Sequence, residues 1–153
     1  KDLNNIAHRE QMAWADTLAG LCIASAGVTL PHGIGMAIGG MYPRVAHGEA
    51  LALIYPEFCA FTWASAIPEF ARLSRLLNPA LHASSDEDAA AASGREIEQL
   101  LQQIGLTKKL RDVHIPKHEP DTLARQSRVL PDYKNNPRVP GCGEIAAILK
   151  NSF

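Results

Sequence analysis

Apolar residues recur at steps of three and four along most of this chain, which is the spacing of one face of an α-helix. The first and longest pattern predicts a helix that Asp2 can cap and that continues to about Ala26. Gly27 is suited to ending this helix, and Pro31 prevents its continuation. The many alanines along it are small enough for neighbouring helices to approach closely.

Similar patterns predict a series of shorter helices in the rest of the chain. They cover residues 33–41, 48–64 with Pro56 inside, 68–77, a helix that Ser84 or Ser85 caps and Gly105 ends, a turn over 107–110, and residues 121–129 and 144–150. No useful length of chain alternates between apolar and polar residues. The sequence therefore predicts an all-α, bundle-like fold.

Composition narrows the class of protein. The 153 residues are enough for a single domain, and 46% hydrophobic against 20% charged residues is typical of a globular protein. With 15 basic and 16 acidic residues and no basic block, we expect neither nucleic acid nor an anionic membrane as a partner. No apolar run reaches about 18 residues, so no membrane span is expected.

The cysteines and the first residue add two expectations. Cys22, Cys59 and Cys142 are widely scattered and form no C-x-x-C pair, which favours reduced thiols in a cytoplasmic protein. The chain opens with Lys1 rather than methionine and enters a helical pattern almost at once. We therefore expect a piece of a longer protein.

One stretch, residues 30–50, has a composition that is unusual for a core helix. It contains four glycines between His32 and Tyr42, and both His32 and His47 are followed by glycine. Each glycine in a helix interior costs roughly 1 kcal/mol relative to alanine. Such a cluster suggests that backbone, ligand or metal comes unusually close here.

Familiar motifs do not explain this stretch. Its glycines miss the spacing of a dinucleotide fingerprint and follow no strand, and the chain contains no H-E-x-x-H, P-loop or G-x-S-x-G. Two histidines at the starts of consecutive helices can converge on one metal ion, with further ligands such as carboxylates required. Glu49 is the nearest carboxylate, although helix geometry turns it away from His47. The alternative is that both histidines are helix caps or satisfied core residues.

The wider pattern resembles the iron-containing (group III) alcohol dehydrogenases. The motifs that carry the resemblance are Pro31-His32-Gly33, Gly39-Gly40, His47-Gly48-Glu49-Ala50, Tyr55-Pro56, Arg9-Glu10-Gln11 and Asn136-Pro137-Arg138. They are spread over essentially the whole chain and are densest over residues 30–56.

This resemblance implies a two-domain enzyme of which the chain is one part. Residues 1–153 would be a single all-helical, dehydroquinate synthase-like C-terminal domain that binds metal. The first helices of that domain and a nucleotide-binding domain would precede it. His32 and His47 match two of the family's metal ligands, and an aspartate and a further histidine would come from the missing helices. The implied cofactors are Fe²⁺ or Zn²⁺ and NAD or NADP.

The resemblance also implies a role for the glycine stretch. Gly33, Met36 and Gly39 would lie beside the nicotinamide cofactor. Phe58, Phe61 and Trp63 would either wall the pocket or, for at least two of them, pack in the core. Many family members carry a histidine implicated in proton handling where this chain has Met36, which cannot transfer a proton. The spacing from His32 to His47 is one residue longer than usual.

Three functions follow from these expectations. The first is an oxidoreductase in which the metal ion polarises the oxygen of a small alcohol or aldehyde during hydride transfer, the isolated chain being inactive; its subunits can form a homodimer. The second is a non-catalytic helical module that binds metal or a partner. The third is a zinc enzyme of the glycerol dehydrogenase or dehydroquinate synthase type.

Overall fold

The computed structural model describes residue 2 and residues 4–153, and these form helices and connecting loops without a β-strand. The all-α prediction is confirmed. The α-helices are α1 (Ile6–Ala26), α2 (Leu30–Met41), α3 (His47–Thr62), α4 (Ile67–Leu77), α5 (Asp86–Ala91), α6 (Ser93–Ile104), α7 (Pro120–Gln126) and α8 (Cys142–Asn151). Short 3₁₀ turns are η1 (Trp63–Ser65), η2 (Pro79–Ala83), η3 (Leu110–Val113) and η4 (Pro131–Asn135).

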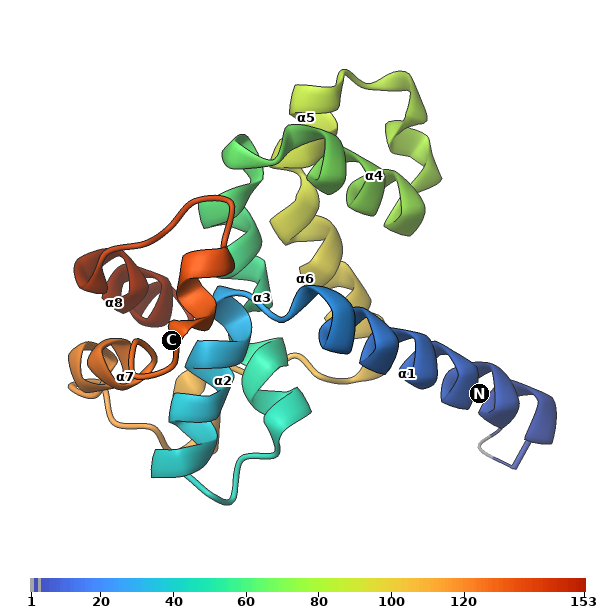
Figure 1. The fold of residues 1–153 in the computed structure, drawn as a ribbon. Coiled ribbons are helices and arrows are strands. Elements are labelled where there is room, and N and C mark those ends of the chain that lie inside the picture. The colour runs from blue at the N-terminus through green and yellow to red at the C-terminus, as the bar shows by residue number, and fades with distance from the viewer. Residues whose placement is uncertain (1, 3) are drawn as a thin grey trace.

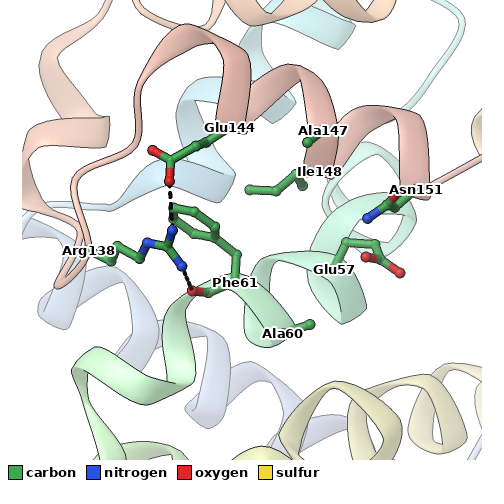
Figure 2. A pocket seen from close by; sticks show the side chains of 8 residues that line it. All are labelled: Glu57, Ala60, Phe61, Arg138, Glu144, Ala147, Ile148 and Asn151. Carbon is green, nitrogen blue, oxygen red and sulfur yellow. Dashed lines mark hydrogen bonds and ion pairs between the residues drawn. The ribbon is translucent and has the colours of Figure 1, made fainter.

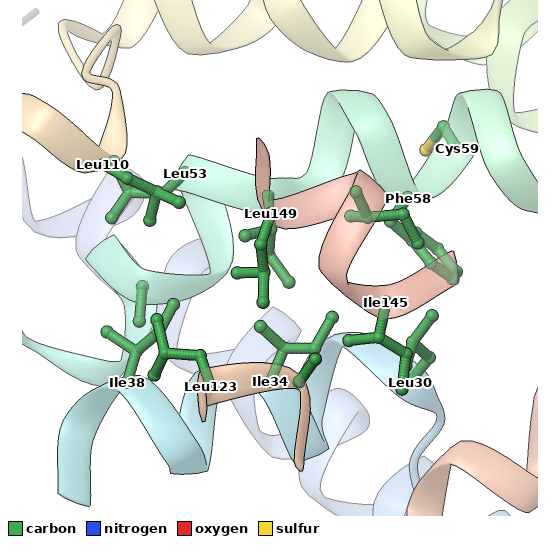
Figure 3. Close-up of a cluster of buried hydrophobic side chains, with 14 of the residues drawn as sticks. Leu30, Ile34, Ile38, Leu53, Phe58, Cys59, Leu110, Leu123, Ile145 and Leu149 are labelled. Atoms are coloured by element: carbon green, nitrogen blue, oxygen red, sulfur yellow. The ribbon is translucent and has the colours of Figure 1, made fainter. Parts of the chain in front are cut away.

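The main core lies where α2, α3, α7 and α8 meet (Figure 3). Its largest side chains are Leu30, Ile34 and Ile38 from α2, Leu53 and Phe58 from α3, Leu110, Leu123 from α7, and Ile145 and Leu149 from α8. Fully burying one such side chain stabilises the fold by about 1.5–3 kcal/mol. This core therefore fixes α2 and α3, the two helices that begin with the histidine motifs.

A second group of helices, α4, α5 and α6, packs beyond the C-terminal half of α3 (Figure 1). The two groups approach closely at Gly94 of α6, where an added Cβ would lie 2.8 Å from the carbonyl oxygen of Pro56. Only glycine allows the α6 backbone to lie so near α3. Pro56 lies inside α3 as the sequence predicts.

α1 differs from every other long helix because it projects away from the rest of the chain (Figure 1). None of its 21 residues is buried. The Asn5 side chain accepts a hydrogen bond from the His8 backbone N–H, so Asn5 caps the helix. The predicted start at Asp2 is therefore wrong, while the predicted end at Ala26 and Gly27 is confirmed.

Other boundaries follow local hydrogen bonding. Ser85 is the cap of the predicted pair, since its hydroxyl accepts from the Asp88 N–H at 3.1 Å. Gly105 ends α6 at φ 78°, as predicted. The helix expected between them is interrupted at Ala92 and forms α5 and α6. The turn predicted over 107–110 instead covers Leu110–Val113 and is capped by Lys109.

The structure bears on two further expectations, that no segment spans a membrane and that the cysteines are reduced. Among the described helices, no single one is long and apolar enough to cross a membrane; α1 and α2 pass that test only as a pair bent by 106°. Cys22, Cys59 and Cys142 are all free thiols. Burial raises the pKa of the Cys59 thiol to about 12, so that thiol is unreactive near neutral pH.

Candidate metal site

His32 lies in the first turn of α2. The helix begins after Thr29, and the His32 backbone N–H donates to the Thr29 carbonyl at 3.0 Å. Pro31 supplies the fixed backbone angle that suits a first turn. This local structure holds the backbone of His32 in place, and its side chain is half-buried.

His47 is the first residue of α3. The preceding loop is tightly turned, since the Val45 N–H donates to the Tyr42 carbonyl at 2.9 Å. The ring of His47 is exposed and lies edge-on to that of His32, with the ring centroids 4.9 Å apart. The two histidine rings, which we call the His pair, thus come together across consecutive helices, as the sequence suggests.

Gly35 makes room for this approach. An added Cβ there would lie 3.1 Å from Cε1 of His47 and 3.0 Å from a methyl group of Leu51. Both distances are tighter than ordinary van der Waals contact, so a larger residue would push the His47 ring or Leu51 away. The glycine enrichment of this stretch therefore has a specific cause at Gly35, which is the close approach that the sequence predicts.

The His pair lacks the partners that caps or core histidines have. Helix α2 is capped by Thr29 and α3 by Ala46, and neither histidine ring hydrogen-bonds to another described residue. Neither histidine therefore acts as a helix cap or as a hydrogen-bonded core residue. Free imidazole nitrogens on two neighbouring rings fit a divalent ion, which binds histidine nitrogen at about 2.0–2.1 Å.

The described part of the chain does not complete a metal site by itself. No group of three or more His, Cys, Asp or Glu residues in residue 2 and residues 4–153 could hold an ion. Glu49, the nearest carboxylate in sequence, accepts a 2.6 Å hydrogen bond from Lys108 instead. A metal ion held by the His pair would therefore need ligands from outside the described residues.

The residues expected beside the cofactor differ in their surroundings. Met36, one turn after His32, is 47% exposed, and an added Cβ at Gly39 would meet nothing within 4 Å. Gly33 is buried, because an added Cβ there would lie 2.9 Å from the carbonyl oxygen of Ser127. Gly33 therefore has a packing role against the end of α7. Gly33 and Met36 also line an open groove of about 490 Å³, together with residues such as Leu130.

The aromatic residues of α3 lie far from the His pair. Phe58 is buried in the core, and Phe61 and Trp63 pack against that core at the other end of α3. At about 1.5 Å per residue, they are roughly 16–24 Å from His47 along the helix axis. The core packing expected for at least two of these aromatics is confirmed, whereas the pocket-wall role is wrong, because the helix separates all three from its own N-terminus.

A second polar cluster lies at that far end of α3 and was not predicted from the sequence. Figure 2 shows three of its residues, Phe61, Arg138 and Glu144. We call it the Arg138 cluster; it consists of Phe61, Thr62, Asn136, Arg138 and Glu144. The Arg138 guanidinium lies 4.0 Å from the centre of the Phe61 ring, donates to the Phe61 carbonyl and pairs with Glu144 at 2.6 Å.

Hydrogen bonds join the other members of the Arg138 cluster. Asn136 donates to the Thr62 hydroxyl at 3.2 Å and to the Arg138 carbonyl at 2.9 Å. The Gly141 backbone N–H, then Arg138, lower the pKa of the Glu144 carboxyl by hydrogen bonding. The Asn-Pro-Arg signal marks this cluster in the sequence, but its partners on α3 are more than seventy positions away.

Comparisons with known proteins identify the family to which the chain belongs. The model of the Fe-containing alcohol dehydrogenase family, C-terminal, matches residues 1–153, so the chain belongs to this family. It is 28% identical over 149 residues to the NAD-dependent methanol dehydrogenase of Bacillus methanolicus, covering 97% of this chain and 39% of that protein. It is 29% identical over 150 residues to the 1,3-propanediol dehydrogenase of Klebsiella pneumoniae, covering 98% and 38%.

Solved structures agree with the sequence relatives. A 1,3-propanediol oxidoreductase superposes with a TM-score of 0.92 at 29% identity, over 98% of this chain and 39% of that one. The alcohol dehydrogenase from Oenococcus oeni gives a TM-score of 0.90 at 25% identity, over 97% and 39%. The chain therefore spans about 39% of the length of these relatives and corresponds to a helical, C-terminal part of them.

Proposed function

We propose that this chain is the metal-binding helical domain of an NAD(P)-dependent alcohol dehydrogenase-like oxidoreductase. The observation that carries the proposal is the His pair, whose rings lie 4.9 Å apart in a chain that belongs to the Fe-containing alcohol dehydrogenase family. The missing share of the relatives' length leaves room for a nucleotide-binding domain and for the first helices of the helical domain. By itself the chain would be inactive.

In this proposal His32 and His47 hold a divalent ion, Fe²⁺ or Zn²⁺, through neutral imidazole nitrogens. The upstream helices supply the remaining ligands. When bound, the ion supplies Lewis-acid chemistry toward the oxygen of a small alcohol or aldehyde. Gly35 lets the His47 ring approach α2, so the separation of the two rings is set by the α2 and α3 backbones.

Met36 and Gly39 would form the surface that faces the nicotinamide, with Gly33 holding α2 against α7 beneath them. The thioether of Met36 has no titratable proton. A proton that leaves an alcohol must therefore pass through another group or water. The apolar Met36 side chain would instead exclude water from the reacting face of the cofactor.

The relatives' names guide the choice of substrate and setting. The proteins named as methanol and 1,3-propanediol dehydrogenases make small primary alcohols the first substrates to assay with NAD and NADP. We place the protein in the cytoplasm, as the three free thiols suggest, without nucleic acid or membrane as a partner. A homodimer is compatible with this proposal.

The full-length protein provides the direct test. We expect His32→Ala to remove the bound metal and, with it, alcohol oxidation, since a lost imidazole ligand leaves the ion weakly held. Metal content is measured by elemental analysis, with His82→Ala as the matched control because that histidine is exposed and remote on η2. Unchanged metal content in the His32 variant would contradict the assignment.

The alternative of a non-catalytic metal module is tested on the chain itself. A half-site with two histidines should bind Fe²⁺ or Zn²⁺ with micromolar or weaker affinity. Tight binding by residues 1–153 alone would favour a self-sufficient module. The metal that the full-length protein contains after purification distinguishes two hypotheses. Iron favours the alcohol dehydrogenase, and zinc favours the glycerol dehydrogenase-like enzyme.

A further inference from the structure

The groove at Gly33 and Met36 lies between α2 and the segment that follows α7. Its volume of about 490 Å³ is within the range of roughly 300–1,000 Å³ that is typical of small-molecule sites. Its lining includes Gly33, Met36, Gly40 and Met41 of α2 and, across from them, Val129 and Leu130. None of the described residues that line it is charged, so the groove favours an apolar ligand.

The spacing of residues along α2 connects this groove to the His pair. Residues four positions apart are neighbours on a helix surface, so His32, Met36 and Gly40 follow one another in a single row. Gly33, where the end of α7 comes against α2, lies at the same level as His32. The groove therefore begins within one helical turn of the His pair. It continues along α2 to Met41, roughly 13 Å from His32 along the helix axis.

Gly40 keeps the middle of the groove free. An added Cβ at this position would meet nothing within 4 Å, so a ligand can lie against the α2 backbone there. Around this space Met36, Met41 and Leu130 are exposed by 47%, 37% and 41% and offer apolar contacts. Methionine side chains are flexible and adapt to ligands of irregular shape. These features together suit a hydrocarbon chain that extends away from the His pair.

We propose that this groove binds the hydrocarbon chain of the substrate, so that unbranched primary alcohols of about four to eight carbons are preferred over methanol and diols. The inference rests on the proposed function, because the hydroxyl oxygen must lie at a metal ion held by the His pair. Each methylene group that leaves water for apolar contacts adds to substrate binding. A second hydroxyl over Met36 and Gly40 would find no side-chain hydrogen-bond partner there, which disfavours a diol.

Steady-state kinetics of the full-length protein with a series of alcohols tests the proposal. We expect kcat/KM to rise roughly two- to fourfold per methylene group from ethanol to 1-hexanol. 1-Butanol and 1,3-propanediol have nearly the same size and differ in a methyl group against a second hydroxyl. We expect a roughly tenfold preference for 1-butanol, because its methyl group needs no hydrogen bond. A flat series, or equal values for this pair, would overturn the proposal.

A substitution that fills the groove provides a second test. For Gly40→Leu we expect kcat/KM to fall at least roughly 30-fold with 1-hexanol and to stay within about threefold with ethanol, which is too short to reach Gly40. Gly143→Leu on α8 is the matched control, because an added Cβ there also meets nothing within 4 Å. Unchanged kinetics with 1-hexanol, or equal losses with both alcohols, would contradict a role of the groove in binding the chain.

The methionine methyl groups allow a measurement that does not depend on activity. In the full-length protein with methyl-labelled methionine, 1-hexanol should shift the NMR signals of Met36 and Met41, which Met36→Leu and Met41→Leu identify. The signal of Met12 on α1, outside the groove, should not move. Unmoved signals at Met36 and Met41 would mean that another part of the protein or a second copy fills the groove, and would overturn the proposal. Metal content of the same sample reports separately on the proposed function, so either can fail without the other.

Discussion

The two ends of α3 hold polar clusters of opposite character. At its N-terminus lies the His pair, of which His47 is exposed and His32 is half-buried, and neither ring has a hydrogen-bond partner among the described residues. At its C-terminus, the Arg138 cluster joins Thr62 and Asn136, exposed by 0% and 3%, to a guanidinium held by two partners. Most polar groups of the Arg138 cluster are paired within the fold, although the buried Oδ1 of Asn136 has no hydrogen-bond partner among the described residues. Groups that bind a ligand, in contrast, keep free valences for it.

The largest expected effect on stability comes from the Arg138 cluster. Asn136→Ala removes two hydrogen bonds and leaves the buried Thr62 hydroxyl without its donor, so we expect a loss of about 2–3 kcal/mol in the free energy of unfolding. His47→Ala should change it by less than about 0.5 kcal/mol, because His47 is exposed. Urea unfolding followed by circular dichroism measures both. Similar losses of unfolding free energy in the two variants would show that the two clusters contribute equally to stability and would contradict this prediction.

Substitution of Gly35 by alanine tests whether metal binding at the His pair depends on the separation of the two rings. An alanine Cβ would displace the His47 ring, and we expect metal affinity of the full-length protein to fall roughly 10–100-fold, as for other residues that orient a ligand. The exposed ring can move, so the free energy of unfolding should change by less than about 1 kcal/mol. Gly143→Ala, with no atom near its added Cβ, is the control. Full metal affinity in the Gly35 variant would contradict this role.

The Arg138 cluster should also show in the pH dependence of stability. The pKa of Glu144 is lowered in the folded state, so its contribution is present above the unfolded pKa of about 4.3 and is lost as pH falls through the folded pKa. Glu144→Gln should therefore lose a small part, about 1 kcal/mol or less, of the stability at pH 7 and be less sensitive to acid. Urea titrations at pH 7 and at pH 3 test this. An identical pH dependence would argue against it.

The smallest effects concern the glycines that follow Met36. An added Cβ meets nothing at Gly39 or Gly40, so alanine at either position should stabilise α2 by about 0.5–1 kcal/mol. If Gly39 lets the cofactor approach the backbone, only Gly39→Ala should also weaken NAD(H) or NADP(H) binding to the full-length protein. Fluorescence titration of the reduced cofactor measures this. Equal binding by both variants would remove Gly39 from the cofactor site.

Periodicity was sufficient to predict the helical class and most helix positions. It placed the ends at Gly27 and Gly105 correctly because a glycine that takes positive φ marks a local stop. It misplaced the start of α1, since Asp2 and Asn5 are both good caps and only the hydrogen bond to His8 distinguishes them. It also missed the break at Ala92, where no residue type signals an interruption.

Less of the candidate site than of the fold could be predicted from the sequence. The convergence of His32 and His47 could be anticipated, since both begin helices that are neighbours in sequence. The function of Gly35 could not be separated from that of Gly33 or Gly39, because the atoms that each one faces belong to other helices. The Arg138 cluster depends on contacts between distant parts of the chain, which a single sequence does not reveal.

The loop from residue 42 to residue 46 is the whole connection between the helices that carry the His pair. Closing a short loop costs little conformational entropy, and contacts that are local in sequence form early in folding. We therefore expect the two rings to meet as soon as the α2–α3 hairpin forms. Under the proposed function, ligands from upstream residues would join later, so the order of folding would set the order in which a metal site is assembled.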